Sequence, residues 1–372
     1  MNVLADLQEF LARAEDWLKD SVPDRWVENR GALSEEDKVQ IRAEWDRQLY
    51  AGGYAGISIP TEFGGQGLGL REEVYFHELA ARAHAPEGMG RVGKILTVPT
   101  LIRHGSDAQR AKYLPGILQG EQVWCQGFSE PGAGSDLASV GTTARKVDGG
   151  YLVSGQKTWT SFAQYAEKSI LLARTDPQAP RHRNLSFFLL DMHQPGVTFR
   201  KIRQISNTSH FSEVFLDDAF VSDDDLVGKE GEGWSVAMTT LTAERGGVEA
   251  ITRYVDVRGD LDLLIRCCAS GHVERAGADE LDVRVELLRW QVIKALDFTD
   301  DDAAFFQRTS ILKVVWSEVW QNVTEMGIAS HCEQHKEHWR NQYLETRAMS
   351  IYSGTNEIQR NIIGDRVLGL PR

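Results

Sequence analysis

The spacing of apolar residues changes twice along this 372-residue chain, and that change constrains its fold more than any other feature. Near the N-terminus the apolar residues recur every three or four positions, which predicts one face of a helix. Past Gln122 the chain changes to short β-branched or aromatic runs separated by turn clusters, which predict a compact all-β unit. From Gly233 onward the helical spacing returns. The order of structure is therefore α, then β, then α.

These changes of period divide the chain into three expected domains, residues 1–121, 122–229 and 230–372. In the first, a helix ends before Pro23, Ser34 caps a second helix, and helical patterns resume from Arg71. The expected strands of the second are residues 151–157, 169–173, 185–191 and 213–221. The apolar stripes of the third are Leu281, Val285, Leu288, Val292 and Leu296, then Ile311, Val315, Val319 and Val323.

The net charge excludes some classes of partner. Lys and Arg number 41 against 54 Asp and Glu, which gives a formal charge of −13. A chain this acidic is not expected to bind nucleic acid or an anionic membrane surface as its main partner. No apolar run approaches the length of a membrane span, and the N-terminus MNVLADLQEF is unlike a secretion signal, so a cytoplasmic location is expected. The four cysteines show no metal-ligand spacing, so no metal is expected.

Three stretches combine glycine, hydroxyl and aromatic residues in ways that suit a ligand. The first runs from Trp124 to Asp136 and ends in SEPGAGSD, where glycines allow backbone N–H groups to approach a ligand closely. A plain β-turn is the alternative, and neither a P-loop nor a GxGxxG helix start is present. The second, GQKTWTS at 155–161, places an indole beside hydroxyls, although a buried structural Trp is the alternative. The third, IYSGTNEIQR at 351–360, could equally be a helix start capped by Thr355.

In this order on an α–β–α chain, these stretches resemble the acyl-CoA dehydrogenase family, and in particular the catalytic-type subunit of heteromeric bacterial members. The resemblance covers nearly the whole chain. Its motifs are IPTEFGGQGLGL (59–70), SEPGAGSD (129–136), GQKTWTS (155–161), FSEVFLDDAFV (211–221) and YSGTNEIQR (352–360). It implies an α+β fold with an N-terminal helical domain, a central β-barrel or sandwich and a C-terminal four-helix bundle. It also implies FAD, with the flavin ring between the β-domain and the C-terminal helices.

The same resemblance implies roles for individual residues. The segment of Phe128 and Ser129 corresponds to the one that contacts the pyrimidine edge of the flavin, Trp159 flanks the ring, and Ser161 donates near flavin N5. Cofactor contacts also correspond to Thr355 and Glu357. The residues expected at the substrate are Ser135, at the pantetheine arm of CoA, and Arg245, Ser353 and Gly354.

The family reaction removes an α-proton from an acyl thioester while the β-hydrogen leaves as hydride to flavin N5. A carboxylate must take that proton, and donors to the thioester oxygen must stabilise the enolate. Many relatives carry the base as a Glu before the Gly of the Tyr-x-Gly-Thr motif, where this chain has Ser353. Others carry it on a C-terminal helix directly before an Arg, where this chain has Glu244. We therefore expect Glu244 to be the base, the alternative being a solvated Glu paired with a nearby Arg.

Two departures from the family pattern predict a partner subunit. Homotetrameric members carry Arg-x-x-Phe-Gly and Gln-x-x-Gly-Gly motifs that hold the ADP half of a neighbour's FAD. Here those regions read Ile265–Glu274, without Phe-Gly, and Val323–Ile328, without the double Gly. Arg266 and Arg275 remain as candidate phosphate contacts, with solvated side chains as the alternative. A diphosphate needs paired donors, so we expect a heterotetramer with a related subunit, or otherwise a homo-oligomer with a rebuilt site.

Such arrangements resemble family members that act on bulky CoA thioesters, including bacterial steroid side-chain intermediates, and electron-transfer flavoprotein or a similar acceptor is implied. The pair Gly246–Gly247 could leave room for a wide acyl group. Two other functions remain open. One is a non-catalytic structural subunit, which fits the loss of the base at Ser353. The other is a family oxidase that uses the same flavin pocket.

Overall fold

A computed structural model describes residues 3–29, 32–244, 247–269 and 275–371. Its helices are α1 Val3–Ser21, α2 Asp24–Asn29, α3 Glu35–Ala51, α4 Leu70–Arg82, α5 Val98–His104, α6 Asp107–Leu118, α7 Gly233–Glu244, α8 Gly247–Ala269, α9 Arg275–Ala295, α10 Asp302–Ala329, α11 Lys336–Thr346 and α12 Asn356–Ile362. Its strands are β1 Trp124–Gly127, β2 Thr143–Val147, β3 Gly150–Ser161, β4 Lys168–Arg174, β5 Leu185–Asp191, β6 Val197–Ile202, β7 Phe211–Ser222 and β8 Leu226–Val227.

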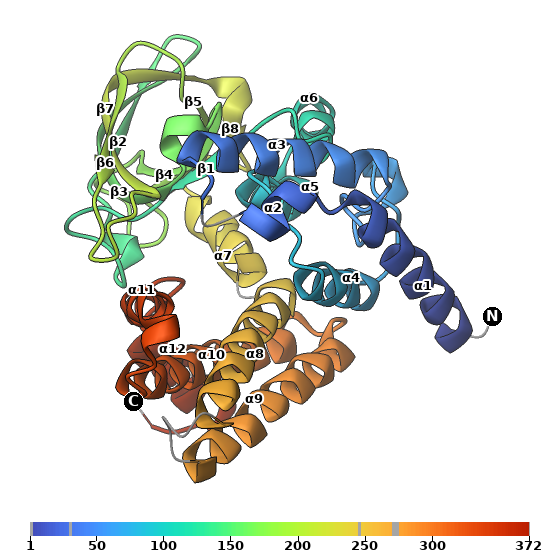
Figure 1. The fold of residues 1–372 in the computed structure, drawn as a ribbon. Helices are drawn as coiled ribbons and strands as arrows, with labels where there is room; N and C mark the ends of the chain where they lie inside the picture. The colour runs from blue at the N-terminus through green and yellow to red at the C-terminus, as the bar shows by residue number, and fades with distance from the viewer. Residues whose placement is uncertain (1–2, 30–31, 245–246, 270–274, 372) are drawn as a thin grey trace. The chain divides into compact units, whose positions relative to one another are not determined.

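The chain forms two compact units that do not follow the order of the sequence. One unit holds residues 23–67 and 86–244, and therefore the whole sheet with α2, α3, α5, α6 and α7. The other holds residues 1–22, 68–85 and 245–372, so that α1 and α4 belong with the C-terminal helices. Within this helical unit, α8, α9 and α10 pack against one another and α4 packs against α8 (Figure 1).

The sheet of the other unit has the strand order β6-β7-β3-β2-β4-β5-β8, and β1 pairs in parallel with β4. The long antiparallel ladder between β3 and β7 carries two irregularities, between Val153 and Gly155 and between Lys157 and Thr160. The four strands that the sequence predicts are confirmed as β3, β4, β5 and β7. Strands β1, β2, β6 and β8 were not predicted. Strand β6 lies at the end of the sheet order with mostly exposed side chains, so it lacks an alternating apolar pattern.

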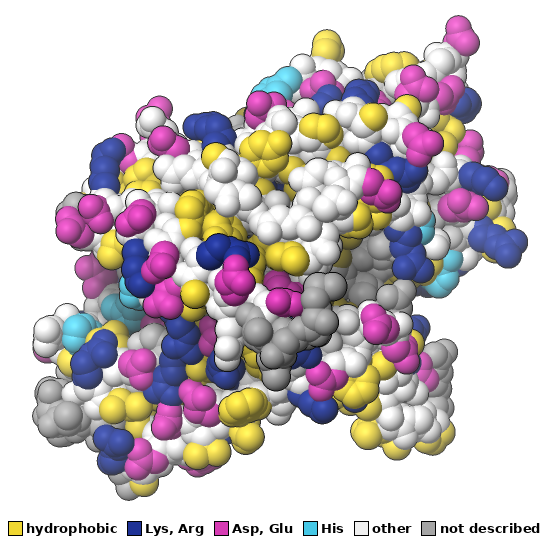
Figure 2. Space-filling model, turned by 90° about the vertical axis from the view of Figure 1, so that its right-hand side faces the viewer, with side chains coloured by type: hydrophobic (Ala, Val, Ile, Leu, Met, Phe, Trp, Pro, Cys, Tyr) yellow, Lys and Arg dark blue, Asp and Glu magenta, His cyan; other side chains and the backbone are white. Residues whose placement is uncertain are grey.

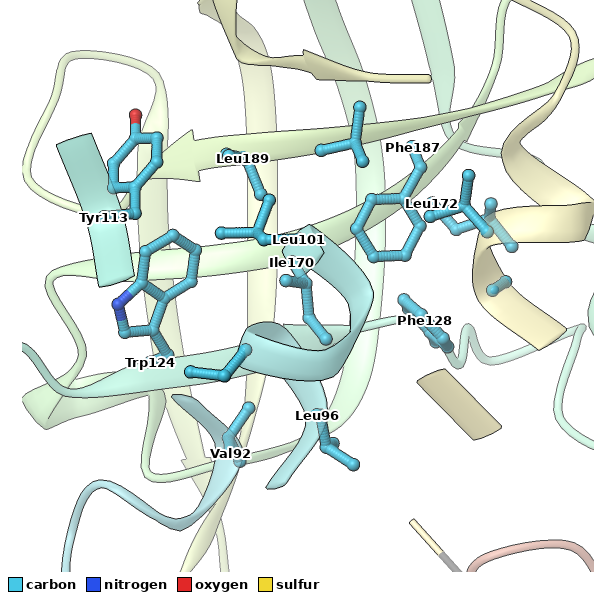
Figure 3. Close-up of a cluster of buried hydrophobic side chains, with 14 of the residues drawn as sticks. Val92, Leu96, Leu101, Tyr113, Trp124, Phe128, Ile170, Leu172, Phe187 and Leu189 are labelled. Atoms are coloured by element: carbon cyan, nitrogen blue, oxygen red, sulfur yellow. The ribbon is translucent and has the colours of Figure 1, made fainter. Parts of the chain in front are cut away.

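A buried apolar cluster joins the sheet to its helices within that unit (Figure 3). Tyr113 of α6 meets Trp124 of β1 edge to face, with ring centroids 5.3 Å apart. Phe128 meets Phe187 of β5 in the same way at 5.8 Å. Because Phe128 directly follows β1, this packing fixes the point at which the SEPGAGSD loop leaves the sheet.

The predicted helices and caps are largely confirmed. The side chain of Ser34 accepts a hydrogen bond from the backbone of Asp37 at the start of α3. The apolar stripe of α9 is buried from Leu281 to Val292, and α8 and α10 contact that helix. Among the described residues, no helix has the length and apolar character needed to cross a membrane. Acidic and basic side chains are interspersed over the face shown in Figure 2.

Candidate functional site

Trp159 stands in the second irregularity of the β3–β7 ladder. The register shifts between Lys157 and Thr160, and Trp159 has a φ of 58°. Its side chain is 57% exposed and meets Phe211 of β7 edge to face at 6.0 Å. The left-handed conformation costs a bulky residue about 1–2 kcal/mol. An exposed indole held in strained backbone is typical of a ligand site, and the alternative of a buried structural Trp is wrong.

Two hydroxyl residues complete the end of β3. Ser161 is half-buried and pairs with Phe211 of β7. The hydroxyl oxygen of Thr160 is buried, and among the residues described here it has no hydrogen-bond partner. An unsatisfied buried hydroxyl is uncommon in native proteins and marks a place where a bound group can supply the bond.

The structure brings the first two sequence motifs together. The backbone N–H of Thr158 donates to the carbonyl oxygen of Ser129 at 2.9 Å. Ser129 is half-buried, whereas the Phe128 side chain is 4% exposed and belongs to the apolar core. A ligand at this segment would therefore contact the backbone of Phe128 rather than its ring.

The loop that follows is open on its glycine side. A Cβ atom built on Gly132 or Gly134 would meet no described heavy atom within 4 Å. Packing within the described chain therefore does not require glycine at either position, and the backbone there is free for close approach. Ser135 is exposed, and Asp136 beside it pairs with Arg181. A bridge between Glu130 and Ala133 shows that the loop begins as a tight turn.

Lys157 is a candidate site residue that the sequence analysis missed. Its side chain is 1% exposed, and its ammonium donates to Glu130 Oε1 at 2.7 Å, to the carbonyl of Leu172 at 2.8 Å and to that of Phe128 at 3.2 Å. Burial lowers the pKa of Lys157 to about 8, and the charge of Glu130 opposes this shift. The alternation of side chains along a strand could have predicted its burial, since Lys157 lies on the same face of β3 as the buried Tyr151 and Val153.

The third motif lies in the helical unit. Ser353 and Gly354 both have positive φ, 54° and 82°. The Gln359 side chain donates to both of their carbonyls, at 3.2 and 3.4 Å, and so holds this turn. Thr355 caps α12 by accepting from the backbone of Ile358 at 3.2 Å, which confirms the alternative predicted for this residue.

Glu357 is exposed in the first turn of α12. A hydrogen bond from its own backbone N–H, followed by one from the Thr355 side chain, holds the pKa of Glu357 below its ordinary value. The carboxylate is therefore stabilised by the start of the helix, where the dipole favours negative charge.

Glu244 is the last residue of α7 and is half-buried. Two side-chain hydrogen bonds tie α7 to α5, Thr240 to Thr100 and Thr239 to His104, each 2.8 Å long. The helix that carries Glu244 is thus anchored four and five residues before its end, a little more than one turn away. The expected substrate residue Arg245, and Gly246 after it, lie outside the described residues.

The two segments that lack the family's adenosine-side motifs are helical where they are described. Arg266 is exposed on α8, and the Nε of Arg275 contacts Asp279 Oδ1 at 2.7 Å on α9. Residues 270–274 lie outside the described part. Val323–Ile328 continues α10, and a Cβ on Gly327 would stand 2.2 Å from the Trp339 ring. Gly327 therefore serves the close packing of α10 on α11.

These features suit a flat, polar-edged ligand of the FAD type. The exposed Trp159 supplies an aromatic face, the hydroxyls of Ser129 and Ser161 supply donors, and the partnerless Thr160 hydroxyl leaves one bond to be made.

Profiles of three consecutive protein domains match the chain. The acyl-CoA dehydrogenase N-terminal domain matches residues 5–121, the middle domain residues 125–219 and the C-terminal domain residues 231–368. The chain is also 38% identical to acyl-CoA dehydrogenase IpdE1 of Mycobacterium tuberculosis, over 99% of each sequence.

Solved structures of this kind share the fold. The ChsE4–ChsE5 complex from Mycobacterium tuberculosis contains a chain with a TM-score of 0.82 and 25% identity, covering 99% of this chain and 98% of that one. The Tcur3481–Tcur3483 steroid ACAD gives a TM-score of 0.82 with 24% identity over 99% and 98% of the two chains.

Proposed function

Because the chain belongs to the acyl-CoA dehydrogenase family of FAD-dependent oxidoreductases, we propose that it binds FAD and introduces an α,β double bond into an acyl-CoA thioester, with Glu244 as the base. The observation that carries this proposal is the exposed, backbone-strained Trp159, joined through Thr158 to the Ser129 segment. A non-catalytic structural subunit would have no use for this costly arrangement.

The residues that would hold FAD fall into two groups. We propose that the Ser129 hydroxyl and the backbone of Phe128 and Ser129 contact the pyrimidine edge, that Trp159 flanks the ring and that Ser161 donates near N5. Thr355 and Glu357 contribute further contacts from the turn that Gln359 holds. When bound, FAD supplies the acceptor for the hydride that leaves the β-carbon.

Residues of the chain itself remove the α-proton and stabilise the enolate. The Glu244 carboxylate takes the α-proton, and the Cα–H electron pair moves into the enolate. The backbone N–H of Ser353 serves as a donor to the thioester oxygen, a role that requires no particular side chain. Ser135, Gly354 and Arg245 are proposed to position the CoA thioester. The anchoring of α7 to α5 supports a fixed position for the helix end that bears Glu244.

Removal of the base provides a direct test. We expect Glu244→Ala to lower the dehydrogenation rate at least about a hundredfold, the scale of a lost general base, with FAD still bound. Adding Ser353→Glu to that variant places a carboxylate where many relatives have theirs, and we expect part of the rate to return. Turnover near the wild-type rate in Glu244→Ala would show that another group is the base.

We further propose that a related subunit completes the site for the ADP half of FAD. The absence of the two adenosine-side motifs supports this, since residues 323–328 form continuous helix. The α9 face formed by Val283, Leu287 and Trp290 also supports it, because these large apolar side chains are each more than half exposed on successive turns. Among the solved structures, the ChsE4–ChsE5 complex contains two different chains.

The experiment that tests the whole proposal is the absorbance spectrum of the purified chain, giving FAD per polypeptide. A chain without flavin that becomes loaded when co-produced with a related subunit would support the shared site. One FAD per chain in an active homo-oligomer would overturn the heteromer and keep the activity. No flavin under either condition would overturn the proposed function.

The acyl group and the electron acceptor are proposed on the same basis. A bulky, steroid-derived acyl-CoA is supported by the likeness to a solved structure named as a steroid ACAD. Electron-transfer flavoprotein is proposed as the acceptor. Reduction of that protein, without peroxide release, is the expected result with substrate, whereas stoichiometric peroxide would identify an oxidase.

A further inference from the structure

Lys157 is the most deeply buried cation connected to the Trp159 and Ser129 segments, and its contacts are specific. One ammonium group joins three places in the chain, namely Phe128 directly after β1, Leu172 on β4 and Glu130 in the loop. An ammonium group has three protons to donate, so each can be assigned to one of these acceptors.

Its counter-ion, Glu130, also forms three hydrogen bonds. The Glu130 carboxylate accepts from the backbone N–H groups of Gly141 at 2.5 Å and Thr142 at 2.9 Å, in addition to Lys157. Burial alone would raise the pKa of Glu130, but the charge and hydrogen bond of Lys157 hold it below its ordinary value. The hydrogen bonds fit an ionised pair, because the ammonium donates to three oxygen atoms and the carboxylate accepts three hydrogen bonds.

The contact with Phe128 matters most for chemistry. The carbonyl of Phe128 and the N–H of Ser129 belong to the same peptide group, so a cation that binds the oxygen draws electron density from the nitrogen. Hydrogen bonds in series polarise one another, and in a buried site this effect is not screened by water. The Ser129 carbonyl is fixed in turn by the N–H of Thr158.

Resting on the proposed function, we propose that Lys157 is a positioning residue that acts through the Phe128–Ser129 peptide, strengthening the Ser129 N–H as a donor to the flavin and thereby raising the flavin reduction potential. Reduction adds negative charge to the flavin ring, so a stronger donor stabilises the reduced form more than the oxidised form. A simple packing role for the ion pair would stabilise the fold without separating the two redox states.

The test compares charge-removing and charge-keeping variants of the full chain in its FAD-loaded form. Lys157→Met keeps the length of the side chain without its charge, Lys157→Gln keeps a donor without the charge, and Lys157→Arg keeps both. We expect the two neutral variants to bind reduced FAD about tenfold less well relative to oxidised FAD, which lowers the two-electron midpoint potential by about 30 mV. Lys157→Arg is expected to restore most of the difference.

Lys94→Met is the matched control, because Lys94 forms a largely buried ion pair with Asp46 at 2.7 Å in the same unit. It is expected to lower the melting temperature without moving the midpoint potential. If Lys157→Met fails to fold, Lys157→Gln and Lys157→Arg still give the comparison.

An unchanged potential in a folded, FAD-loaded neutral variant would overturn the inference and leave the proposed function standing. So would equal shifts in the Lys157 and Lys94 variants. A wild-type chain that takes up no FAD, alone or with a related subunit, would overturn the proposed function and this inference together.

Discussion

At the scale of single residues, the backbone of Trp159 shows most clearly how this chain sacrifices stability at its candidate site. A tryptophan with a φ of 58° and 57% of its side chain exposed gains little from burial and carries a conformational cost. The position is tolerated because the β3–β7 ladder continues on both sides of the irregularity. The ligand contact proposed above would account for a residue that packing does not explain.

Substitution of Trp159 separates its expected contact with FAD from the strain in its backbone. Trp159→Gly and Trp159→Ala should both weaken FAD binding strongly, measured by titration of the apoprotein. Without FAD, the glycine variant should be more stable to urea than the alanine variant by about 1 kcal/mol, since only glycine adopts this φ without cost. Phe199→Ala, which removes an exposed aromatic ring from β6 of the same sheet, should leave FAD affinity unchanged. Equal stability of the two Trp159 variants would contradict the strain.

The contacts of Lys157 and the exposure of Trp159 could not be predicted for a common physical reason, since both depend on the tertiary structure. The importance of Lys157 depends on which carbonyls surround it, and a sequence gives no carbonyl positions. Strand parity could have indicated that it faces the core, but the Glu130 partner lies 27 residues earlier in a loop. Trp159 was identified as a candidate, yet its exposure depends on a register shift between two strands that no local pattern encodes.

At the scale of elements, a carboxylate on α4 joins that helix to α9. Glu78 accepts from Arg289 at 2.8 and 3.0 Å and from Arg82 at 2.9 Å, with only 5% of its side chain exposed. Burial by itself would raise the pKa of Glu78, but the two guanidinium groups lower it below its ordinary value of 4.5. The pair connects helices that are more than 200 residues apart in sequence.

This contact predicts an acid limb for the helical unit, that is, a fall in its free energy of unfolding as the pH decreases. Because the folded-state pKa is lower than the unfolded one, Glu78 contributes its full stabilisation above about pH 4.5 and loses it as the pH falls through the folded value. Glu78→Gln should cost about 3 kcal/mol at pH 7 and flatten the acid limb in urea unfolding. Glu325→Gln, which breaks a more exposed pair with Arg347, should cost less than about 1 kcal/mol. An unaltered acid limb in Glu78→Gln would rule out this role.

Elements with a strong local pattern were predicted well. The apolar stripe of α9 and the four predicted strands follow from apolar spacing alone. Those strands are β3, β4, β5 and β7. Strands β1 and β8 were not predicted, because four and two residues are too few to establish a period. Their pairing with β4 and β5 is a tertiary effect.

At the scale of the whole molecule, the α–β–α order along the sequence does not predict which segments pack together. Sequence periodicity divides the chain into consecutive domains, whereas the compact units take α1 and α4 away from the N-terminal helices and place them with α8, α9 and α10. Apolar faces on α1 and α4 predict burial, but spacing within a helix does not identify the partner that covers it.

The α9 face of Val283, Leu287 and Trp290 gives a prediction at this scale. Leu287→Asp places a charge in the centre of that face and should reduce the mass of the assembly, measured by light scattering after size exclusion with the related subunit present. Val27→Asp, at an exposed apolar position on α2, should leave the mass unchanged. An assembly that retains its full mass with Leu287→Asp would show that its contacts lie elsewhere.

The division into units also sets an order of events during synthesis. Helix α1 packs against α4, and α4 packs against α8, so the unit that holds them needs a helix that is made much later than the first two. About 165 residues separate the end of α4 from the start of α8, and at the usual 5–20 residues per second they take roughly 8 to 33 s to synthesise. During this interval the side of α4 that packs against α8 lacks that partner, while the segment that contains the sheet is being completed. Truncation before α8 should therefore leave α4 sensitive to protease, measured by limited proteolysis.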